Sequence, residues 1–314
     1  MPERVLVIKL GALGNIVLSL GPFAAIRRYH RQAAITLLTT APYAAWMASS
    51  PYFDRLWADG RPDWWDAPGW LRLRRQLLAG RFDRVYDLQT AARSNRYFQL
   101  FPHAARPQWS GIALGCSHPD RDPARNRLHD IERQAGQLRQ AGIPEVPDAD
   151  LSWSSGDIAR FGLPASIALL VPGSSAHRLG KRWPARHYGE LARVLATRGL
   201  APVVLGTAAE RRLADEIGEH APVHDLTGQT GFGQLASLAR VAKLAVGNDT
   251  GPMHLIAAAG CPSLVLFSRA SDPALCAPRG WCVAVLHRHD LATLAVDEVL
   301  ASATRLSMPP VAAS

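Results

Sequence analysis

The stretch Ala245–His254 (AVGNDTGPMH) joins the end of an apolar strand to the start of a helix. Pro252 suits a first helical turn and Gly260 suits a helix C-terminus, so the residue types mark both ends of this helix. The start of a helix offers unpaired backbone N–H groups and a partial positive charge, which together favour an anion such as a diphosphate. Asp249 falls at the carboxyl end of the strand, where open α/β sheets bind ligands. Taken alone, the stretch also fits an ordinary capped helix.

Strand and helix patterns alternate in two series along the chain. The first series begins with a buried-strand pattern at Arg4–Leu10 and passes through the turn Gly11–Asn15 into an apolar helix that ends near Tyr29. The next strand is expected at Ala34–Thr39, which completes a βαβ unit with a parallel sheet. A linker is expected at Ala149–Pro164, and the second series starts after it.

The remaining elements follow the same alternation. Strands are expected at Arg84–Leu88, Ile167–Val171, Ala201–Leu205, Leu244–Val246 and Ser263–Phe267, and helices at Leu71–Ala79, Asp130–Gln140, His187–Arg198, Glu210–Glu219, Phe232–Arg240 and Leu291–Leu306. Residues 102–128 are rich in Pro, Arg and His and are expected to form irregular loop. The pattern predicts an α/β fold of two Rossmann-like domains, residues 1–155 and 156–314, that face a central cleft.

The composition indicates how many domains the chain can form and in which compartment the protein is expected. Its 314 residues are 48% hydrophobic, which is enough for two domains with their own cores. The sequence contains no run of 18 uncharged apolar residues, so no transmembrane helix is expected. The first residues lack the charged region followed by an apolar region that is typical of a signal peptide. The four cysteines lack paired zinc spacing and are expected to be reduced thiols in a cytoplasmic protein. We expect no metal site.

The net charge of +9 is spread over both halves of the chain, and the isoelectric point is near 9.9. Acidic small molecules and anionic membrane surfaces are therefore suitable partners. Nucleic acid is disfavoured, because the sequence has no zinc finger, no RNP-like aromatic motif and no repeated basic helix.

Two further strand ends carry candidate ligand-binding residues. Pro172–Ser175 follows a strand, so its hydroxyl and backbone N–H groups are expected beside the 249–254 segment. Lys181 comes six residues later, and its ammonium could neutralise a departing diphosphate. Glu210 follows the strand Ala201–Leu205, where a carboxylate can accept hydrogen bonds from a ribose. Structural alternatives remain: Lys181 could lie on the surface before a helix, and Glu210 could stabilise a helix start.

Together these segments resemble glycosyltransferase family 9, the ADP-heptose:lipopolysaccharide heptosyltransferases. The resemblance covers nearly the whole chain. In the second half it rests on VPGSS, KRWP, LGTAAE, GNDTGPMH and SRASDPALCAPRG, which begin at Val171, Lys181, Leu205, Gly247 and Ser268. In the first half it rests on VIKLGALGN, YDLQ with Arg93 and Ser94, and HDIE, which begin at Val7, Tyr86 and His129.

The resemblance implies a GT-B fold, with the acceptor bound by the N-terminal domain and the nucleotide sugar by the C-terminal one. It also implies inverting transfer without a metal or another cofactor. By match to the family motifs, the donor phosphates would contact Ser174, Ser175 and Lys181. The remaining donor contacts would be Glu210 with the ribose, Asp249 with sugar hydroxyls, and the Thr250 and Gly251 amides with the diphosphate, with His254 nearby.

One position departs from the family pattern. Members usually have Leu-Gly-Asp at the first turn, and that aspartate is the expected general base, whereas this chain has Asn15. An amide cannot take a proton near neutral pH, although Asn15 could still orient the acceptor. Asp87 is our first candidate for a replacement base, and Asp130 or Glu132 the second. Alternatively, the acceptor could be activated by its own phosphate, or the protein could bind without efficient transfer.

The cluster of Trp64, Trp65 and Trp70 lies beside the arginine-rich segment Leu71–Leu78. Indoles favour a membrane interface and arginines attract anionic headgroups, which would suit a lipid-linked acceptor at the cytoplasmic face of the inner membrane. In the alternative interpretation, the tryptophans fill the core of the domain and the arginines are solvated.

The leading hypothesis is transfer of a heptose-like sugar from an ADP-sugar to a lipopolysaccharide core or a related glycan. A second hypothesis is a non-catalytic sugar-nucleotide- or glycan-binding protein on a degenerate transferase scaffold. An NAD-dependent oxidoreductase is disfavoured, because the turn Gly11–Gly14 lacks the Gly-x-Gly-x-x-Gly spacing that lets a dinucleotide approach the backbone.

Overall fold

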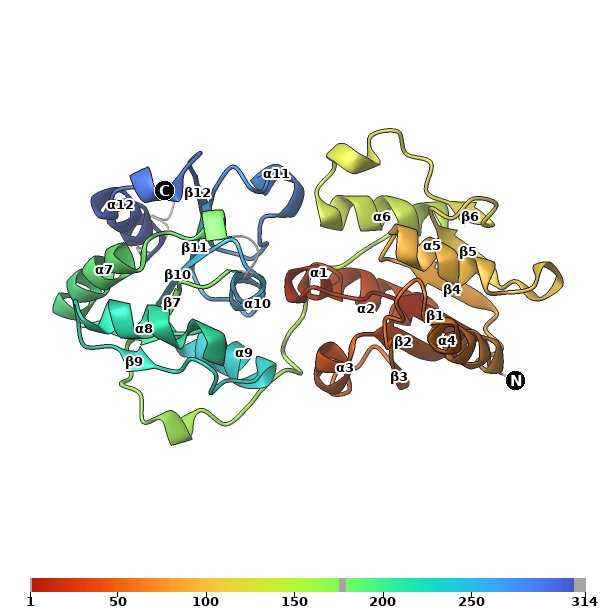
Figure 1. The fold of residues 1–314 in the computed structure, drawn as a ribbon, viewed down its shortest axis with the longest axis horizontal. Coiled ribbons are helices and arrows are strands. Elements are labelled where there is room, and N and C mark those ends of the chain that lie inside the picture. Colours follow the sequence, from red (N-terminus) through yellow and green to blue (C-terminus); the bar gives the residue numbers. More distant parts are fainter. Residues whose placement is uncertain (1, 175–178, 308–314) are drawn as a thin grey trace, which may run out of the picture. The chain divides into compact units, whose positions relative to one another are not determined.

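The computed structural model describes residues 2–174 and 179–307. The chain forms two compact units, Met1–Trp153 and Ser154–Ser314, which we call the N-terminal and C-terminal domains (Figure 1). The sequence placed this boundary at residues 155 and 156.

The N-terminal domain is built on a six-stranded parallel sheet in the order β3-β2-β1-β4-β5-β6. Its strands are β1 (Arg4–Ile8), β2 (Ala34–Thr39), β3 (Arg55–Ala58), β4 (Arg84–Asp87), β5 (Gln108–Gly111) and β6 (His118–Pro119). Its helices are α1 (Leu13–Val17), α2 (Leu20–Tyr29), α3 (Ala41–Met47), α4 (Ala67–Ala79), α5 (Ala92–Gln99) and α6 (Asp130–Gln140).

Successive residues of β1 are buried on opposite faces of this sheet, as strand geometry requires. Leu6 and Ile8 belong to a cluster that includes Leu73 of α4 and Phe98 of α5, so these two helices cover one face. Burial on both faces explains why β1 is apolar at every position after Arg4.

The C-terminal domain repeats this plan in the order β12-β11-β10-β7-β8-β9, again with all strand pairs parallel. Its strands are β7 (Ile167–Val171), β8 (Ala201–Val204), β9 (His224–Asp225), β10 (Leu244–Asn248), β11 (Ser263–Phe267) and β12 (Val283–His287). Its helices are α7 (Ala185–Thr197), α8 (Arg211–Gly218), α9 (Phe232–Val241), α10 (Gly251–Ala258), α11 (Pro273–Cys276) and α12 (Val296–Ser307).

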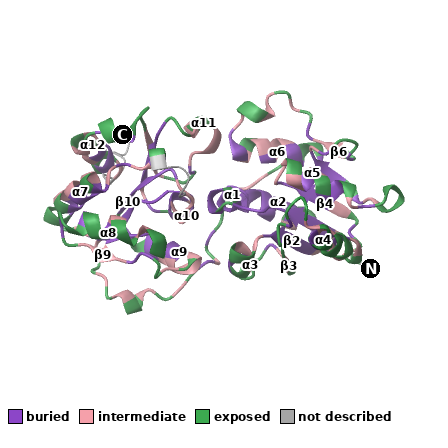
Figure 2. Ribbon diagram, viewed as in Figure 1, coloured by how far each residue is buried: buried purple, intermediate pink, exposed green. Residues whose placement is uncertain are grey.

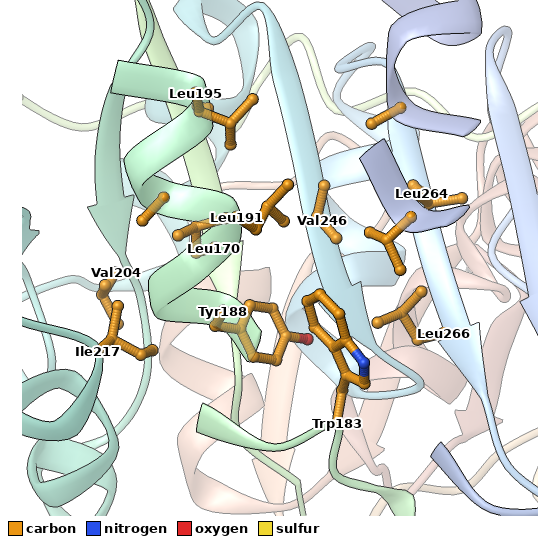
Figure 3. Packing of buried hydrophobic residues seen from close by; sticks show 14 of the residues in the cluster. Leu170, Trp183, Tyr188, Leu191, Leu195, Val204, Ile217, Val246, Leu264 and Leu266 are labelled. Carbon is orange, nitrogen blue, oxygen red and sulfur yellow. The ribbon is translucent and has the colours of Figure 1, made fainter. Parts of the chain in front are cut away.

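The core of the C-terminal domain includes two large aromatic side chains. Trp183 and Tyr188 pack edge to face with ring centroids 4.8 Å apart, and they belong to one buried cluster with Val246 and Leu266 (Figure 3). Aromatic pairs prefer this geometry and bury large areas. The segment just before α7 is therefore fixed against the sheet by its own tryptophan.

Both sheets have the doubly wound order in which the direction of strand addition reverses between the first and fourth strands. The reversal falls between β1 and β4 in one domain and between β7 and β10 in the other. Ligands of open α/β sheets bind outside the carboxyl ends of the strands at such a point. The prediction of an α/β fold with two Rossmann-like domains is confirmed, and the cleft between them stays a prediction.

Several local expectations were wrong. The helix expected to run unbroken to Tyr29 is interrupted near Ser19, whose Oγ donates to the carbonyl oxygen of Asn15 at 2.7 Å, a contact that disturbs helices. Residues 102–128 contain β5 and β6 instead of loop alone. These strands have only four and two residues, too few for a periodic signal.

Candidate functional site

The switch point of the C-terminal domain brings Lys181 to Asp249. Asp249 directly follows β10, and Lys181 lies in the connection from β7 to α7. Lys181 Nζ forms an ion pair with Asp249 Oδ2, and Ser271 Oγ donates to the same oxygen at 2.5 Å. Only 10% and 7% of the two side chains are exposed. Removing one partner of such a pair leaves a charge without compensation, so each side chain holds the other in place.

Asn248, which the sequence analysis missed, connects three segments of this site. Its Oδ1 accepts hydrogen bonds from Trp183 N at 3.0 Å and Tyr188 Oη at 3.1 Å. Its Nδ2 donates to the carbonyl oxygen of Pro172 at 2.7 Å. The amide therefore ties the end of β10 to the segment after β7 and to the segment that carries Lys181. The available signal was a polar residue that ends a fully buried strand.

Ser174 lies on the other side of the same switch point, three residues after the end of β7. It is 7% exposed and accepts two hydrogen bonds from Arg182. Arg182 Nε donates to Ser174 Oγ and Arg182 Nη2 to the Ser174 carbonyl oxygen, both at 3.0 Å. Arg182 is a second cation that the sequence analysis did not assign. Ser175, the other predicted phosphate contact of this segment, lies outside the described residues.

Glu210 reaches the loop after β7 from the start of α8. Its Oε2 accepts from Thr207 N at 2.8 Å and from Thr207 Oγ1 at 3.1 Å, which is a capping arrangement. Its carboxylate also lies against the backbone of Gly173, where an added Cβ would come 1.8 Å from Glu210 Oε1. Glu210 therefore stabilises a helix start, as the structural alternative predicted. The same contacts place its carboxylate beside the predicted donor-binding loop.

The amino end of α10 completes this group. Thr250 is its N-cap residue in extended conformation, and Pro252 occupies the first turn. The first N–H groups of a helix have no acceptor within it, so the Thr250 and Gly251 amides can receive an anion. His254 follows in the same helix and is 6% exposed.

The close approach of α10 to the sheet depends on a glycine. A Cβ on Gly247 would lie 2.6 Å from Met253 Sδ and 2.7 Å from Val171 Cβ. Only glycine allows β10 and β7 to pack against the first turn of α10 at this distance. The amino end of α10 is thereby fixed beside Lys181 and Asp249.

The N-terminal switch point contains a buried cation. Lys9 is 3% exposed; its Nζ donates to the carbonyl oxygen of Leu88 at 3.0 Å and lies 3.6 Å from Asp130 Oδ2. Burial lowers the pKa of Lys9, although Asp130 opposes this. Burial alone would raise the pKa of Asp130, but the charges of Lys9 and Arg133 hold it below its usual value. Asp130 is therefore a weak proton acceptor.

Asp87, at the end of β4, is completely buried. Its Oδ1 accepts from Gln89 N at 3.1 Å and Thr90 N at 3.0 Å, which shapes the turn before α5. Burial raises the pKa of Asp87 to about 6. By contrast, Asn15 is exposed on α1, and the half-exposed Glu132 lies 3.1 Å from His129 Nδ1.

Among the described residues, no group of three or more His, Cys, Asp or Glu side chains is arranged to hold a metal ion. Two cationic side chains lie at the C-terminal switch point: Lys181, paired with Asp249, and Arg182, bonded to Ser174. They lie near the amino end of α10 and the carboxyl ends of β7 and β10. Such a group of fixed donors can stabilise the charge of a leaving anion.

The sequence pattern of a family described as "Glycosyltransferase family 9 (heptosyltransferase)" matches residues 70–290. The chain belongs to glycosyltransferase family 9. The resemblance derived from the motifs is thus confirmed, and this family 9 protein is an enzyme that transfers glycosyl groups.

Individual relatives agree with this assignment. The chain is 24% identical to the lipopolysaccharide core heptosyltransferase OpsX of Haemophilus influenzae over 286 residues, which cover 85% of this chain and 79% of the relative. A shorter match, 35% identical over 97 residues, aligns 29% of this chain with 28% of lipopolysaccharide heptosyltransferase 2 of Escherichia coli.

Solved structures share the fold of this glycosyltransferase. A family 9 glycosyltransferase from Veillonella parvula superposes with a TM-score of 0.82 at 20% identity, covering 97% of both chains. The ADP-heptose lipopolysaccharide heptosyltransferase II of E. coli gives 0.77 at 22% identity, covering 97% and 98%. The E. coli heptosyltransferase WaaC with ADP gives 0.74 at 22% identity, covering 97% and 100%. The predicted GT-B class is confirmed.

Proposed function

We propose that this glycosyltransferase moves a heptose-like sugar from an ADP-sugar to a lipopolysaccharide core or a related glycan. The observation that carries the proposal is the Lys181–Asp249 ion pair beside the amino end of α10. The activities after which the relatives are named support the sugar and the acceptor, and the WaaC complex with ADP supports the nucleotide.

In the proposed reaction, an acceptor hydroxyl attacks the anomeric carbon of the donor as the bond to the diphosphate breaks. A single displacement of this kind inverts the anomeric configuration. The leaving ADP gains negative charge, which Lys181, Arg182 and the Thr250 and Gly251 amides would stabilise. These groups supply the positive charge that a metal would otherwise provide, so we propose transfer without metal or cofactor.

The C-terminal domain is the proposed donor-binding domain and the N-terminal domain the proposed acceptor-binding one. Ser174, Ser175 and His254 join the proposed phosphate contacts, and Glu210 takes the ribose. Asp249 has two roles in this proposal: it orients Lys181 and faces the sugar hydroxyls.

Asp87 is the proposed general base, and Asn15 orients the acceptor. A pKa of about 6 suits a base that works near neutral pH, whereas the lowered pKa of Asp130 does not. Since Asp87 is buried, the proposal requires the turn at Gln89 and Thr90 to open so that the carboxylate meets the acceptor hydroxyl. The pKa of about 6 is that of the free protein with the turn closed. The competing hypothesis of a non-catalytic binding protein predicts donor binding without product.

The experiment is a transfer assay with ADP-heptose and heptose-free lipopolysaccharide. We expect a glycosylated product with inverted anomeric configuration, read by NMR, and no loss of rate with a chelator. If product forms only from UDP- or GDP-sugars, the proposed donor is wrong. A lipid-linked acceptor would place the enzyme at the cytoplasmic face of the inner membrane. No described helix has the length and apolar character needed to cross a bilayer.

A further inference from the structure

Two tryptophans project into solvent from the turn before α4. Trp64 is 76% exposed and Trp65 is 65% exposed, and their rings pack edge to face with centroids 5.2 Å apart. The other two tryptophans of this region, Trp57 and Trp70, are partly buried against the core of the domain. The interpretation that the tryptophans fill the core therefore holds for Trp70 and is wrong for Trp64 and Trp65. Adjacent exposed aromatic rings mark an interaction surface.

Helix α4, which begins two residues after Trp65, has a mixed apolar and basic face exposed to solvent. Leu73 and Leu77 point into the core, one turn apart. At about 100° per residue, the opposite face carries Leu71, Arg72 and Arg75, all exposed, and exposed residues recur along α4 in Figure 2. We call Trp64, Trp65, Leu71, Arg72 and Arg75 the Trp-Arg surface.

The charges of this surface are available to a partner. Within residues 2–174 and 179–307, neither Arg72 nor Arg75 forms an ion pair. The nearby acidic residue Asp66 caps α4 through its Oδ1, which accepts from Gly69 N at 2.9 Å, and among the described residues it forms no ion pair with either arginine. Asp63 is the other carboxylate of the turn, and the segment from Asp63 to Arg75 carries three arginines against two aspartates.

We propose that the Trp-Arg surface docks the enzyme onto an anionic lipid bilayer. Indole rings are enriched at the headgroup level of membranes, where an apolar body and a polar N–H are both satisfied. Arg72 and Arg75 are exposed on the helix that follows this turn and can pair with lipid phosphates. The inference rests on the proposed lipid-linked acceptor, and it identifies the surface by which the enzyme reaches that acceptor.

The test is sedimentation of the full-length enzyme with vesicles of phosphatidylethanolamine and phosphatidylglycerol, compared with pure phosphatidylcholine. We expect the wild-type enzyme to partition onto the anionic vesicles and to be released by salt. Trp64→Ser with Trp65→Ser should weaken partitioning on the order of tenfold. Arg72→Gln with Arg75→Gln should weaken it by roughly fivefold for each arginine.

Matched controls come from the C-terminal domain. Trp281 is 69% exposed, so Trp281→Ser removes an equally accessible indole. Arg186 and Arg193 are exposed on α7, and Arg186→Gln with Arg193→Gln removes the same charge. Both controls should bind vesicles as the wild-type enzyme does. The proposal is overturned if the wild-type enzyme stays in the supernatant, or if the surface variants and the controls bind equally.

Activity separates this inference from the proposed function. The Trp64 and Trp65 double variant should transfer to a deacylated, soluble acceptor at the wild-type rate and lose transfer to the same acceptor embedded in vesicles. An unchanged thermal midpoint verifies that the variant is folded. If the wild-type enzyme glycosylates neither acceptor but still binds vesicles through this surface, the proposed function fails and the docking surface stands.

Discussion

Lys181 Nζ and Asp249 Oδ2 form a nearly buried ion pair between two loops that are 68 residues apart in the chain. The pair joins the carboxyl ends of β7 and β10, which are neighbours in the sheet. An ammonium held by one carboxylate is fixed in position before a ligand arrives. A fixed charge stabilises a leaving group without the cost of reorganisation during the reaction.

The first prediction concerns nucleotide binding by Lys181. ADP should raise the thermal midpoint of the wild-type enzyme more than GDP or UDP, since a ligand at 100 times its Kd adds about 2.7 kcal/mol of stability. Lys181→Ala should reduce the shift, because the diphosphate loses its ammonium partner. Lys243→Ala, which removes an exposed lysine just before β10, serves as the control. An ADP shift that is equal in both variants would remove Lys181 from the donor site.

The second prediction uses the contact between Gly173 and Glu210. Gly173→Ala should displace the Glu210 carboxylate, because the new methyl group would occupy its position. Affinity for ADP should fall by roughly tenfold or more, as expected when a hydrogen bond to a charged group is lost. Gly218→Ala is the control, since a Cβ at the end of α8 meets nothing within 4 Å. Isothermal titration calorimetry measures the affinity of both variants for ADP. If Gly173→Ala and Gly218→Ala bind ADP equally well, Glu210 is not the ribose ligand.

The sequence predicted those parts of the site that a local pattern of residues marks, and missed those that depend on partners far apart in the chain. The segments at Asp249 and Lys181 follow buried apolar strands, so topology predicted that they come to one edge of the sheet. For Lys181 a surface position remained open, and the family resemblance assigned it to the donor site. Asn248 was missed because its role arises from partners in three separate segments. The exposure of Trp64 and Trp65 was undecided for a related reason, since an aromatic residue in a turn can pack inward or outward. Short edge strands such as β6 depend on neighbours for their conformation and leave no periodic pattern.

The third prediction is a pH dependence of stability caused by Asp87. Its folded pKa of about 6 lies above the unfolded value of 3.8, so the folded state holds the proton more tightly. Protonation of Asp87 therefore stabilises the folded state. This stabilisation is present in full below pH 3.8 and is lost as the pH rises through 6. A shift of this size corresponds to about 3 kcal/mol.

Asp87→Asn should remove this dependence, because the amide does not titrate while its Oδ1 still accepts from the turn. Denaturant unfolding at a series of pH values measures the difference between the variant and the wild-type enzyme. The relative stability of the variant should increase between about pH 4 and 6. A constant difference across this range would contradict the raised pKa.

The last prediction concerns the proton acceptor. If Asp87 is the base, Asn15→Asp leaves turnover nearly unchanged, whereas Asp87→Asn lowers it by about 10²–10⁴-fold. The kcat/KM of the wild-type enzyme should also fall as the pH drops below about 6, because Asp87 of the free enzyme is then protonated and cannot accept a proton. Asn126→Asp adds the same charge at another exposed position of the N-terminal domain and controls for electrostatics. A large gain in turnover for Asn15→Asp alone would mean that the wild-type enzyme lacks an efficient base, and Asp87 would lose its proposed role.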